Sequence, residues 1–165
     1  MRKLPIGIQS FEDIRTNGYL YVDKTEYIWN LVESGKVYFL SRPRRFGKSL
    51  LISTMEAYFQ GRHELFSGLT IETLENKRKN PWTHYPVVHF SMAGGQYRTK
   101  QGLVNILSDV IVSTAVQYGI KEKISGDDLA VQFRQLIRAL KELTGNGAVI
   151  LVDEYDIWKG NFQYM

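Results

Sequence analysis

The chain has 165 residues, of which 44% are hydrophobic and 23% are charged, a composition typical of one globular domain with a real core. Its net charge is +4, and all of the excess lies in residues 1–80. The absence of cysteine excludes disulfides, cysteine-ligated metals and thiol catalysis. No apolar run approaches the roughly 18 residues of a membrane-spanning helix, and the N-terminus lacks the apolar core of a secretory signal. We therefore expect a cytoplasmic protein without membrane contact.

The N-terminal part of the chain is expected to form two helices and then a strand. A short helix is expected around residues 11–14. Apolar residues at helical spacing predict a second helix over about residues 25–33, ended by a glycine. The continuous apolar run that follows predicts the first buried strand at residues 36–41.

The next segment is expected to be helical and then irregular. Apolar residues after Lys48 indicate a helix that stops near Gly61, and a shorter helical piece is expected at residues 63–66. Residues 70–80 are polar and include three consecutive basic residues. We therefore expect a solvated loop at residues 70–80.

The C-terminal half is predicted to contain two strands around two long helices. The strand candidates are residues 86–91 and 148–152. Apolar residues at helical spacing predict one helix at residues 100–118. They predict a second that starts after an N-cap cluster before residue 129 and ends near residue 143. Together with residues 36–41, these strands are separated by helices. This order indicates an α/β fold with a mostly parallel sheet.

The most informative motif is the loop at residues 41–49, Ser-Arg-Pro-Arg-Arg-Phe-Gly-Lys-Ser, between a predicted strand and a predicted helix. This is the layout of a P-loop, or Walker A element. The layout suits phosphate because backbone N–H groups and the positive end of the helix dipole point at one place. Lys48 adds a full charge there, and the Ser49 hydroxyl is a suitable Mg²⁺ ligand. The general motif has Gly where this chain has Arg42.

Basic residues gather in the same loop. Arg42, Arg44, Arg45 and Lys48 lie within seven positions. Such a cluster suits a polyphosphate, and it equally attracts the backbone of a nucleic acid. The excess charge of the whole chain is too small to make nucleic acid the leading partner.

A second nucleotide-binding motif is expected later in the chain. The apolar run at residues 148–152 ends in Asp153 and Glu154, as in a Walker B strand followed by a catalytic acid. The Asp would help to hold Mg²⁺, and the Glu would orient and polarise the attacking water. Alternatively, the two acids only mark a strand that turns into solvent. The upstream P-loop favours the nucleotide-site interpretation.

With these elements in place, the chain resembles the predicted AAA-ATPase-like family of bacteria, whose members often carry a PD-(D/E)XK-nuclease-like region after the ATPase. The resemblance rests on runs in the family's order, at residues 5–11, 21–25, 39–49, 56–59, 64–66 and 151–156. The family itself uses Arg where the general P-loop has its first Gly, so Arg42 is expected to be a family trait. Pro43 fits this interpretation because its fixed φ stiffens the turn.

The resemblance implies binding of ATP with Mg²⁺. The expected nucleotide-binding residues lie in the loop and at the helix start: Arg42, Arg44, Arg45, Phe46, Gly47, Lys48, Ser49 and Leu50. Ser49 and Asp153 are the expected metal ligands, and Glu154 is the expected catalytic residue. Lys24 and Thr25 match the family's N-terminal motif, which either lies near the nucleotide or simply starts a helix.

The match to the family stops after Asp156, so the chain looks like a C-terminally truncated copy. We expect a lead-in at residues 1–35, a Walker A to Walker B core at 36–156 and a divergent tail at 157–165. In related P-loop ATPases, a strand that follows Walker B in sequence lies between the two site-bearing strands. The expected fold is therefore a P-loop NTPase-like three-layer α/β fold, incomplete at its C-terminal end.

Two other functional interpretations stay open at this point. One is a nucleic-acid-associated module, and the other is a non-functional gene fragment or a chain that needs a protein partner or self-association. No sensor residue or arginine finger is identifiable, and the loss of an arginine finger costs about 10³–10⁵ in rate. We therefore expect nucleotide binding without efficient ATP hydrolysis.

Overall fold

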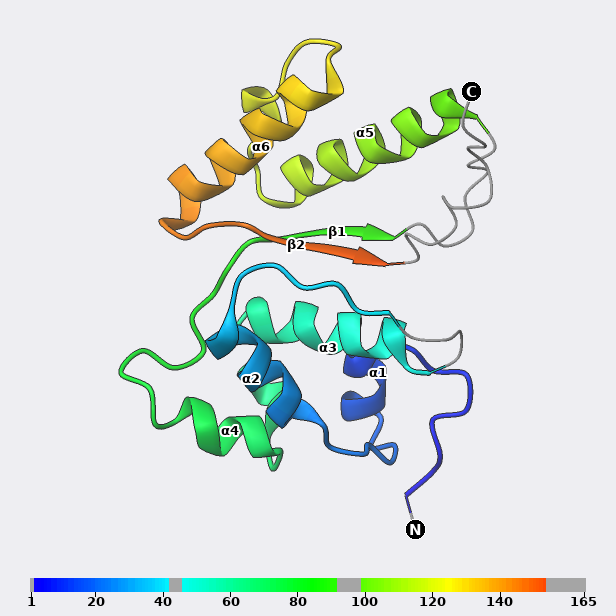
Figure 1. Ribbon diagram of the computed structural model, residues 1–165, viewed down its shortest axis with the longest axis vertical. Coiled ribbons are helices and arrows are strands. Elements are labelled where there is room, and N and C mark those ends of the chain that lie inside the picture. The colour runs from blue at the N-terminus through cyan, green and yellow to red at the C-terminus, as the bar shows by residue number, and fades with distance from the viewer. Residues whose placement is uncertain (1, 42–45, 92–98, 154–165) are drawn as a thin grey trace. The chain divides into compact units, whose positions relative to one another are not determined.

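The computed structural model describes residues 2–41, 46–91 and 99–153. The chain divides into two compact units, residues 1–84 and residues 85–165. Figure 1 shows the helices and strands of each unit. The first unit contains the start of the candidate phosphate-binding helix, and the second contains the candidate Walker B strand.

The described part of the first unit is helical. Its elements are α1 (Phe11–Thr16), α2 (Thr25–Ser34), α3 (Lys48–Phe59), the 3₁₀-helix η1 (His63–Phe66) and α4 (Thr70–Glu75). Phe11 and Phe66 are fully buried, with ring centroids 4.9 Å apart, and they pack with Ile28 and Tyr58 in one hydrophobic cluster. Burial of this cluster joins helices from both sides of the P-loop motif in one core.

The segment before the P-loop is an integral part of this core. The backbone N–H of Phe11 donates to Ser53 Oγ on α3 at 2.9 Å. Arg15 Nε donates to the carbonyl of Leu65 at 2.7 Å, and Arg62 donates two hydrogen bonds to the carboxylate of Glu12. The lead-in predicted at residues 1–35 therefore packs on the helix that opens the candidate site.

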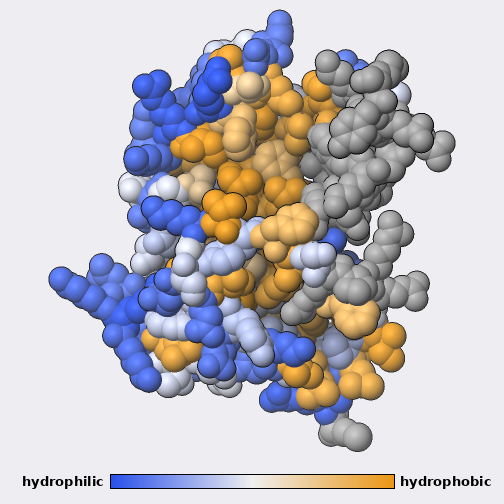
Figure 2. Space-filling model, viewed as in Figure 1, coloured by the Kyte–Doolittle hydropathy of each residue, from blue (hydrophilic) through white to orange (hydrophobic). Residues whose placement is uncertain are grey.

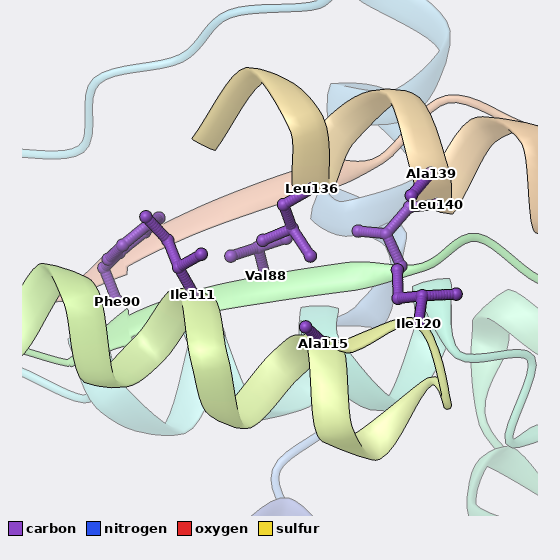
Figure 3. Close-up of a cluster of buried hydrophobic side chains, with 8 residues drawn as sticks. All are labelled: Val88, Phe90, Ile111, Ala115, Ile120, Leu136, Ala139 and Leu140. Atoms are coloured by element: carbon purple, nitrogen blue, oxygen red, sulfur yellow. The ribbon is translucent and has the colours of Figure 1, made fainter. Parts of the chain in front are cut away.

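The second unit is a small α/β arrangement. Its elements are β1 (Val87–Ser91), α5 (Lys100–Gln117), the 3₁₀-helix η2 (Lys121–Lys123), α6 (Leu129–Thr144) and β2 (Val149–Asp153). The strands pair in parallel, with Val87 opposite Val149 and Ser91 opposite Asp153. Figure 3 shows the core of this unit, where side chains of β1 meet those of α5 and α6. In α5 and α6, apolar residues recur with the period of an α-helix, so they lie on one face, which packs on the strands.

Local signals explain how α6 begins and ends. The Asp128 carboxylate accepts hydrogen bonds from the backbone N–H groups of Ala130 and Val131, which are among the first in the helix. Gly145 ends the helix with φ 73°, a left-handed conformation that suits glycine. Helix and cap were both predicted from the sequence, and both are confirmed.

The prediction of a strand at residues 36–41 is wrong. The structure has these residues outside any strand, and the side chains of Val37 and Phe39 are 92% and 69% exposed. Figure 2 shows that hydrophobic residues reach the molecular surface elsewhere as well. An apolar run supplies β-propensity, but β-propensity depends strongly on context and does not by itself make a strand. The sheet in the described residues therefore has two strands and not the expected three.

The loop predicted at residues 70–80 is also partly wrong, because α4 occupies its first half. The backbone N–H of Thr70 at the start of α4 donates to Asp23 Oδ2 at 2.7 Å. Ile71 is fully buried, and Glu75 is 1% exposed. The helix is therefore held by residues distant in sequence, which a local reading of polarity does not detect.

These elements confirm the general prediction of an α/β chain with a parallel sheet. The strands predicted at residues 86–91 and 148–152 and the long helices predicted around residues 100–118 and 129–143 are all present. None of the helices in the described ranges combines the length and the apolar character that crossing a bilayer requires.

Candidate nucleotide-binding site

A left-handed glycine stands at the start of α3. Gly47 immediately precedes the helix with φ 73° and ψ 22°, in the left-handed region. Its carbonyl accepts the N–H of Leu51 at 3.0 Å, so the first helical turn is already closed. A Cβ placed on Gly47 would meet nothing within 4 Å. The backbone conformation, and not crowding, is therefore what favours glycine here.

The first turn of α3 is electrostatically suited to an anion. The N-cap residue of α3 is Gly47, which has no side chain to cap the helix, and the first turn contains no acidic residue. At the same position of α6, by contrast, Asp128 supplies a carboxylate to the first amides. The helix dipole and the Lys48 charge add positive potential at the same end. This arrangement favours a phosphate or a similar anion.

Packing fixes the direction of α3. Thr54 is 1% exposed, and its hydroxyl donates to the carbonyl of Leu50 at 2.7 Å. Ser53 accepts the N–H of Phe11, the first residue of α1. These contacts lie within two turns of Lys48. The N-terminal end of α3 is therefore held from its sides, and its first turn remains half-exposed to solvent.

Asp153 is the last residue of β2 and is 6% exposed. Parallel pairing places it opposite Ser91 at the carboxyl end of β1. The carboxyl ends of parallel strands are the usual place for ligand-binding residues in open α/β sheets. Asp153 therefore lies at the edge of the sheet where such residues are usually found.

The Asp23–Thr25 motif starts a helix, which was one of the two alternatives left open by the sequence. Asp23 Oδ1 accepts hydrogen bonds from the N–H and the hydroxyl of Thr25, and Oδ2 accepts them from the N–H and the hydroxyl of Thr70. Thr25 Oγ1 in turn accepts the N–H of Ile71 at 3.1 Å. One carboxylate therefore joins the N-terminal ends of α2 and α4.

The charge of Asp23 is stabilised by this arrangement. Partial burial opposes ionisation, but the hydrogen bonds from Thr70 and Thr25 outweigh it, so the pKa of Asp23 is lowered. The sequence reasoning did not assign this role to Asp23. The only local signal was its position two residues before the helix predicted from residue 25, and the partner at Thr70 lies 47 residues away.

The predicted site residues divide among three groups. Phe46, Gly47, Lys48, Ser49 and Leu50 lie together at the start of α3 in the first unit, and Asp153 lies at the end of β2 in the second unit. The remaining predicted residues lie outside the described residues, namely Arg42, Arg44, Arg45 and Glu154.

The described residues therefore define a mixed α/β protein with a helix that starts after a left-handed glycine and carries Gly-Lys-Ser. A model of the predicted AAA-ATPase family matches residues 5–161. The chain belongs to this AAA-ATPase-like family, as its sequence motifs indicated.

Among curated proteins, the chain is similar to an uncharacterized protein encoded in the vnfD 5′ region of Azotobacter chroococcum mcd 1. The two are 40% identical over 157 residues, which cover 94% of this chain and 29% of that protein. The chain therefore spans less than a third of that relative. No solved structure matches the chain.

Proposed function

We propose that this chain is an ATP-binding P-loop domain. The observation that carries the proposal is the start of α3, where left-handed Gly47 leads into a helix with no acidic residue in its first turn. Lys48 and Ser49 are the first two residues of that helix. Family membership supports a nucleotide as the anion. The geometry supports a phosphate group as the part that is bound.

The proposed phosphate site comprises the basic loop and the first turn of α3. The amides of Gly47, Lys48 and Ser49 would donate to phosphate oxygens, and the Lys48 ammonium would neutralise their charge. The full set extends to neighbouring residues on both sides: Arg42, Arg44, Arg45, Phe46 and Leu50. Arg42 stands where the general motif has a glycine, and Arg44 or Arg45 would compensate by supplying side-chain charge to the phosphates.

The proposed metal ligands are Ser49 and Asp153. A hydroxyl and one carboxylate fit Mg²⁺, which commonly keeps several waters and relies on the phosphates for further ligands. Mg²⁺ would neutralise phosphate charge, and Glu154 would orient the attacking water if the chain hydrolyses ATP. In the described ranges, no group of three or more His, Asp or Glu residues could hold a metal by itself. A site completed by the nucleotide needs no such group.

The P-loop three-layer fold is part of this proposal. The adjacent parallel strands β1 and β2, with α5 and α6 packed on them, supply one portion of such a fold. A cytoplasmic location and a protein partner also remain proposals.

A titration with Mg²⁺-ATP tests the proposed nucleotide site. We expect the wild-type chain to bind, and we expect Lys48→Ala to bind much more weakly because the phosphate charge loses its side-chain partner. Lys121→Ala is the matched control, since Lys121 is an exposed lysine in η2 of the second unit. Isothermal titration calorimetry on the three proteins measures the affinities.

Equal and weak binding by the wild type and Lys48→Ala would overturn the proposal. Equal binding loss in Lys48→Ala and Lys121→Ala would indicate general charge attraction and not a phosphate site. Circular dichroism of each variant verifies that α3 is still folded.

A further inference from the structure

A buried carboxylate links α3 to the segment that leaves the first unit. Glu75, the last residue of α4, is 1% exposed. Its Oε1 accepts the hydroxyl of Tyr58 on α3 at 2.5 Å, and its Oε2 accepts the backbone N–H of Trp82 at 2.9 Å. Trp82 lies in the connector, which we define as residues 76–86 between α4 and β1. One side chain therefore bonds to both α3 and the connector.

Aromatic packing strengthens the same link. The Trp82 ring lies 5.2 Å from the ring of Phe66 and 6.0 Å from that of Tyr58, measured between centroids. Burial raises the pKa of the Tyr58 hydroxyl, and its hydrogen bond to Glu75 raises it further. The hydroxyl therefore stays protonated and remains a donor over the physiological pH range.

The backbone at Trp82 is in an unusual conformation. Its φ is 53°, and it is the only residue other than glycine with a positive φ among those that the structure describes. A bulky side chain rarely adopts this region, and such residues persist only where surrounding contacts hold them. The hydrogen bond to Glu75 and the ring contacts are the contacts that hold Trp82.

Arg78 attaches the connector to α2 as well. Its guanidinium lies 4.2 Å above the ring of Trp29, pairs with Glu33, and approaches Glu75 Oε1 at 3.4 Å. The first part of the connector is therefore fixed to α2, α3 and α4. It continues along the chain into β1, the strand that pairs with the Asp153-bearing β2.

Tyr58 lies ten residues after Lys48 in a single helix of 12 residues. Ten residues span about 15 Å of helix, and a regular helix moves as a rigid element. A change in the tilt or position of α3 at its N-terminal end therefore also displaces the Tyr58 hydroxyl. Because Glu75 receives hydrogen bonds from both Tyr58 and Trp82, that displacement reaches the strained backbone of the connector.

We propose that Glu75 is a positioning residue that couples α3 to the connector, so that a nucleotide bound at the start of α3 changes the surroundings of Trp82. This inference rests on the proposed nucleotide site. It assigns to that site a route by which ligand binding alters the segment that leads to β1.

Tryptophan fluorescence tests the coupling on the full chain. Mg²⁺-ATP is titrated while the emission of the wild type and of Trp82→Phe is recorded, and calorimetry measures binding separately. We expect an emission change in the wild type that is absent in Trp82→Phe. We expect Tyr58→Phe to bind Mg²⁺-ATP as the wild type does but to lose this emission change, because the variant removes only the hydroxyl that bonds to Glu75.

Matched variants distinguish coupling from loss of structure. Tyr27→Phe removes the hydroxyl of a tyrosine on α2 that is 67% exposed, and it should keep the full emission change. Glu75→Gln should lose the change as Tyr58→Phe does. Glu26→Gln, an exposed acid on α2, should keep it.

Separate outcomes overturn the two proposals. Absence of calorimetric binding in the wild type would overturn the nucleotide site and the coupling together. Binding that leaves the emission of Trp82 unchanged would overturn the coupling alone, and so would an equal emission change in the wild type and Tyr58→Phe.

Discussion

The carboxylate of Asp23 is the clearest case in which one residue organises distant parts of the chain. It accepts four hydrogen bonds of 2.7–2.9 Å, two from Thr25 at the start of α2 and two from Thr70 at the start of α4. Negative charge is also favourable near helix N-termini. The motif around Lys24 and Thr25 therefore has a structural explanation that needs no contact with a nucleotide.

Asp23→Asn should destabilise the chain at neutral pH. The amide group keeps the shape of the side chain, but its nitrogen is unable to accept the hydrogen bonds of Thr70 or Thr25. We expect a loss of about 1–3 kcal/mol in the free energy of unfolding, measured with urea. Asp109→Ala, a change at an exposed position of α5, is the control and should have little effect.

The effect of Asp23→Asn should depend on pH in a defined direction. The pKa of Asp23 is lower in the folded chain than its ordinary value, so its contribution is fully present above the unfolded pKa of about 3.9. It is lost as the pH falls through the lower folded pKa. The difference between the wild type and Asp23→Asn should therefore shrink on acidification, and a constant difference would contradict the assignment.

At the scale of elements, the start of α3 depends on a single backbone conformation. Gly47 has φ 73°, and an added Cβ would have open space around it. Asp128 starts α6 with a side-chain cap, whereas the residue at the same position of α3, Gly47, has no side chain. The two helices therefore begin differently, one with a capping carboxylate and the other with a left-handed glycine.

Gly47→Ala should lower the free energy of unfolding by about 1–2 kcal/mol, because an L-residue in the left-handed region is strained by its own Cβ. It should also weaken the binding of Mg²⁺-ATP by displacing the first amides of α3. Gly147→Ala is the matched control: its φ is not positive, and its added Cβ would also meet nothing within 4 Å. Equal stability of the two variants would contradict this role of Gly47.

The element scale also shows where sequence reasoning succeeds and fails. Helices α5 and α6 and strands β1 and β2 lie within two residues of their predicted limits, since their signals are local. Helix α4 was missed because Asp23 and a buried environment hold it. The apolar residues 36–41 resemble a strand, but β-structure requires a neighbouring strand that local sequence does not supply.

At the scale of the whole molecule, each of the two units has its own hydrophobic core. The first unit packs around Phe11, Phe66 and Tyr58, and the second around Val88, Ile111 and Leu136. Each cluster is composed of residues from one unit. Stability is therefore expected to vary between the units, as it does between cooperative segments of other proteins.

Leu136→Ala tests this division. Leu136 is fully buried between β1 and the helices of the second unit, so its truncation should cost about 2–5 kcal/mol. Hydrogen exchange measured by mass spectrometry should show a large loss of protection in α5, α6, β1 and β2. A smaller loss is expected in α1 to α4, and equal loss in both units would contradict two separate cores.

The candidate site itself was predicted in part by sequence. Gly47, Lys48 and Ser49 were recognised because three adjacent residues specify a loop and a helix start, and Asp153 because it ends an apolar run. The network of Glu75, Tyr58 and Trp82 was not predicted. The two hydrogen-bonded pairs of this network are separated by 17 and 7 residues along the chain, and no single motif contains all three residues.

By itself, the sequence determined the family, the glycine-lysine-serine helix start, the acidic end of β2 and most of the helices. These features depend on residues close together in the chain, where propensity and spacing act directly. Only the tertiary structure decided that Asp23 joins α2 to α4, that Glu75 joins α3 to the connector, and that residues 36–41 are not a strand. The links made by Asp23 and Glu75 depend on hydrogen-bond partners distant in sequence, and the state of residues 36–41 depends on tertiary context that overrides β-propensity, so local sequence decides none of the three.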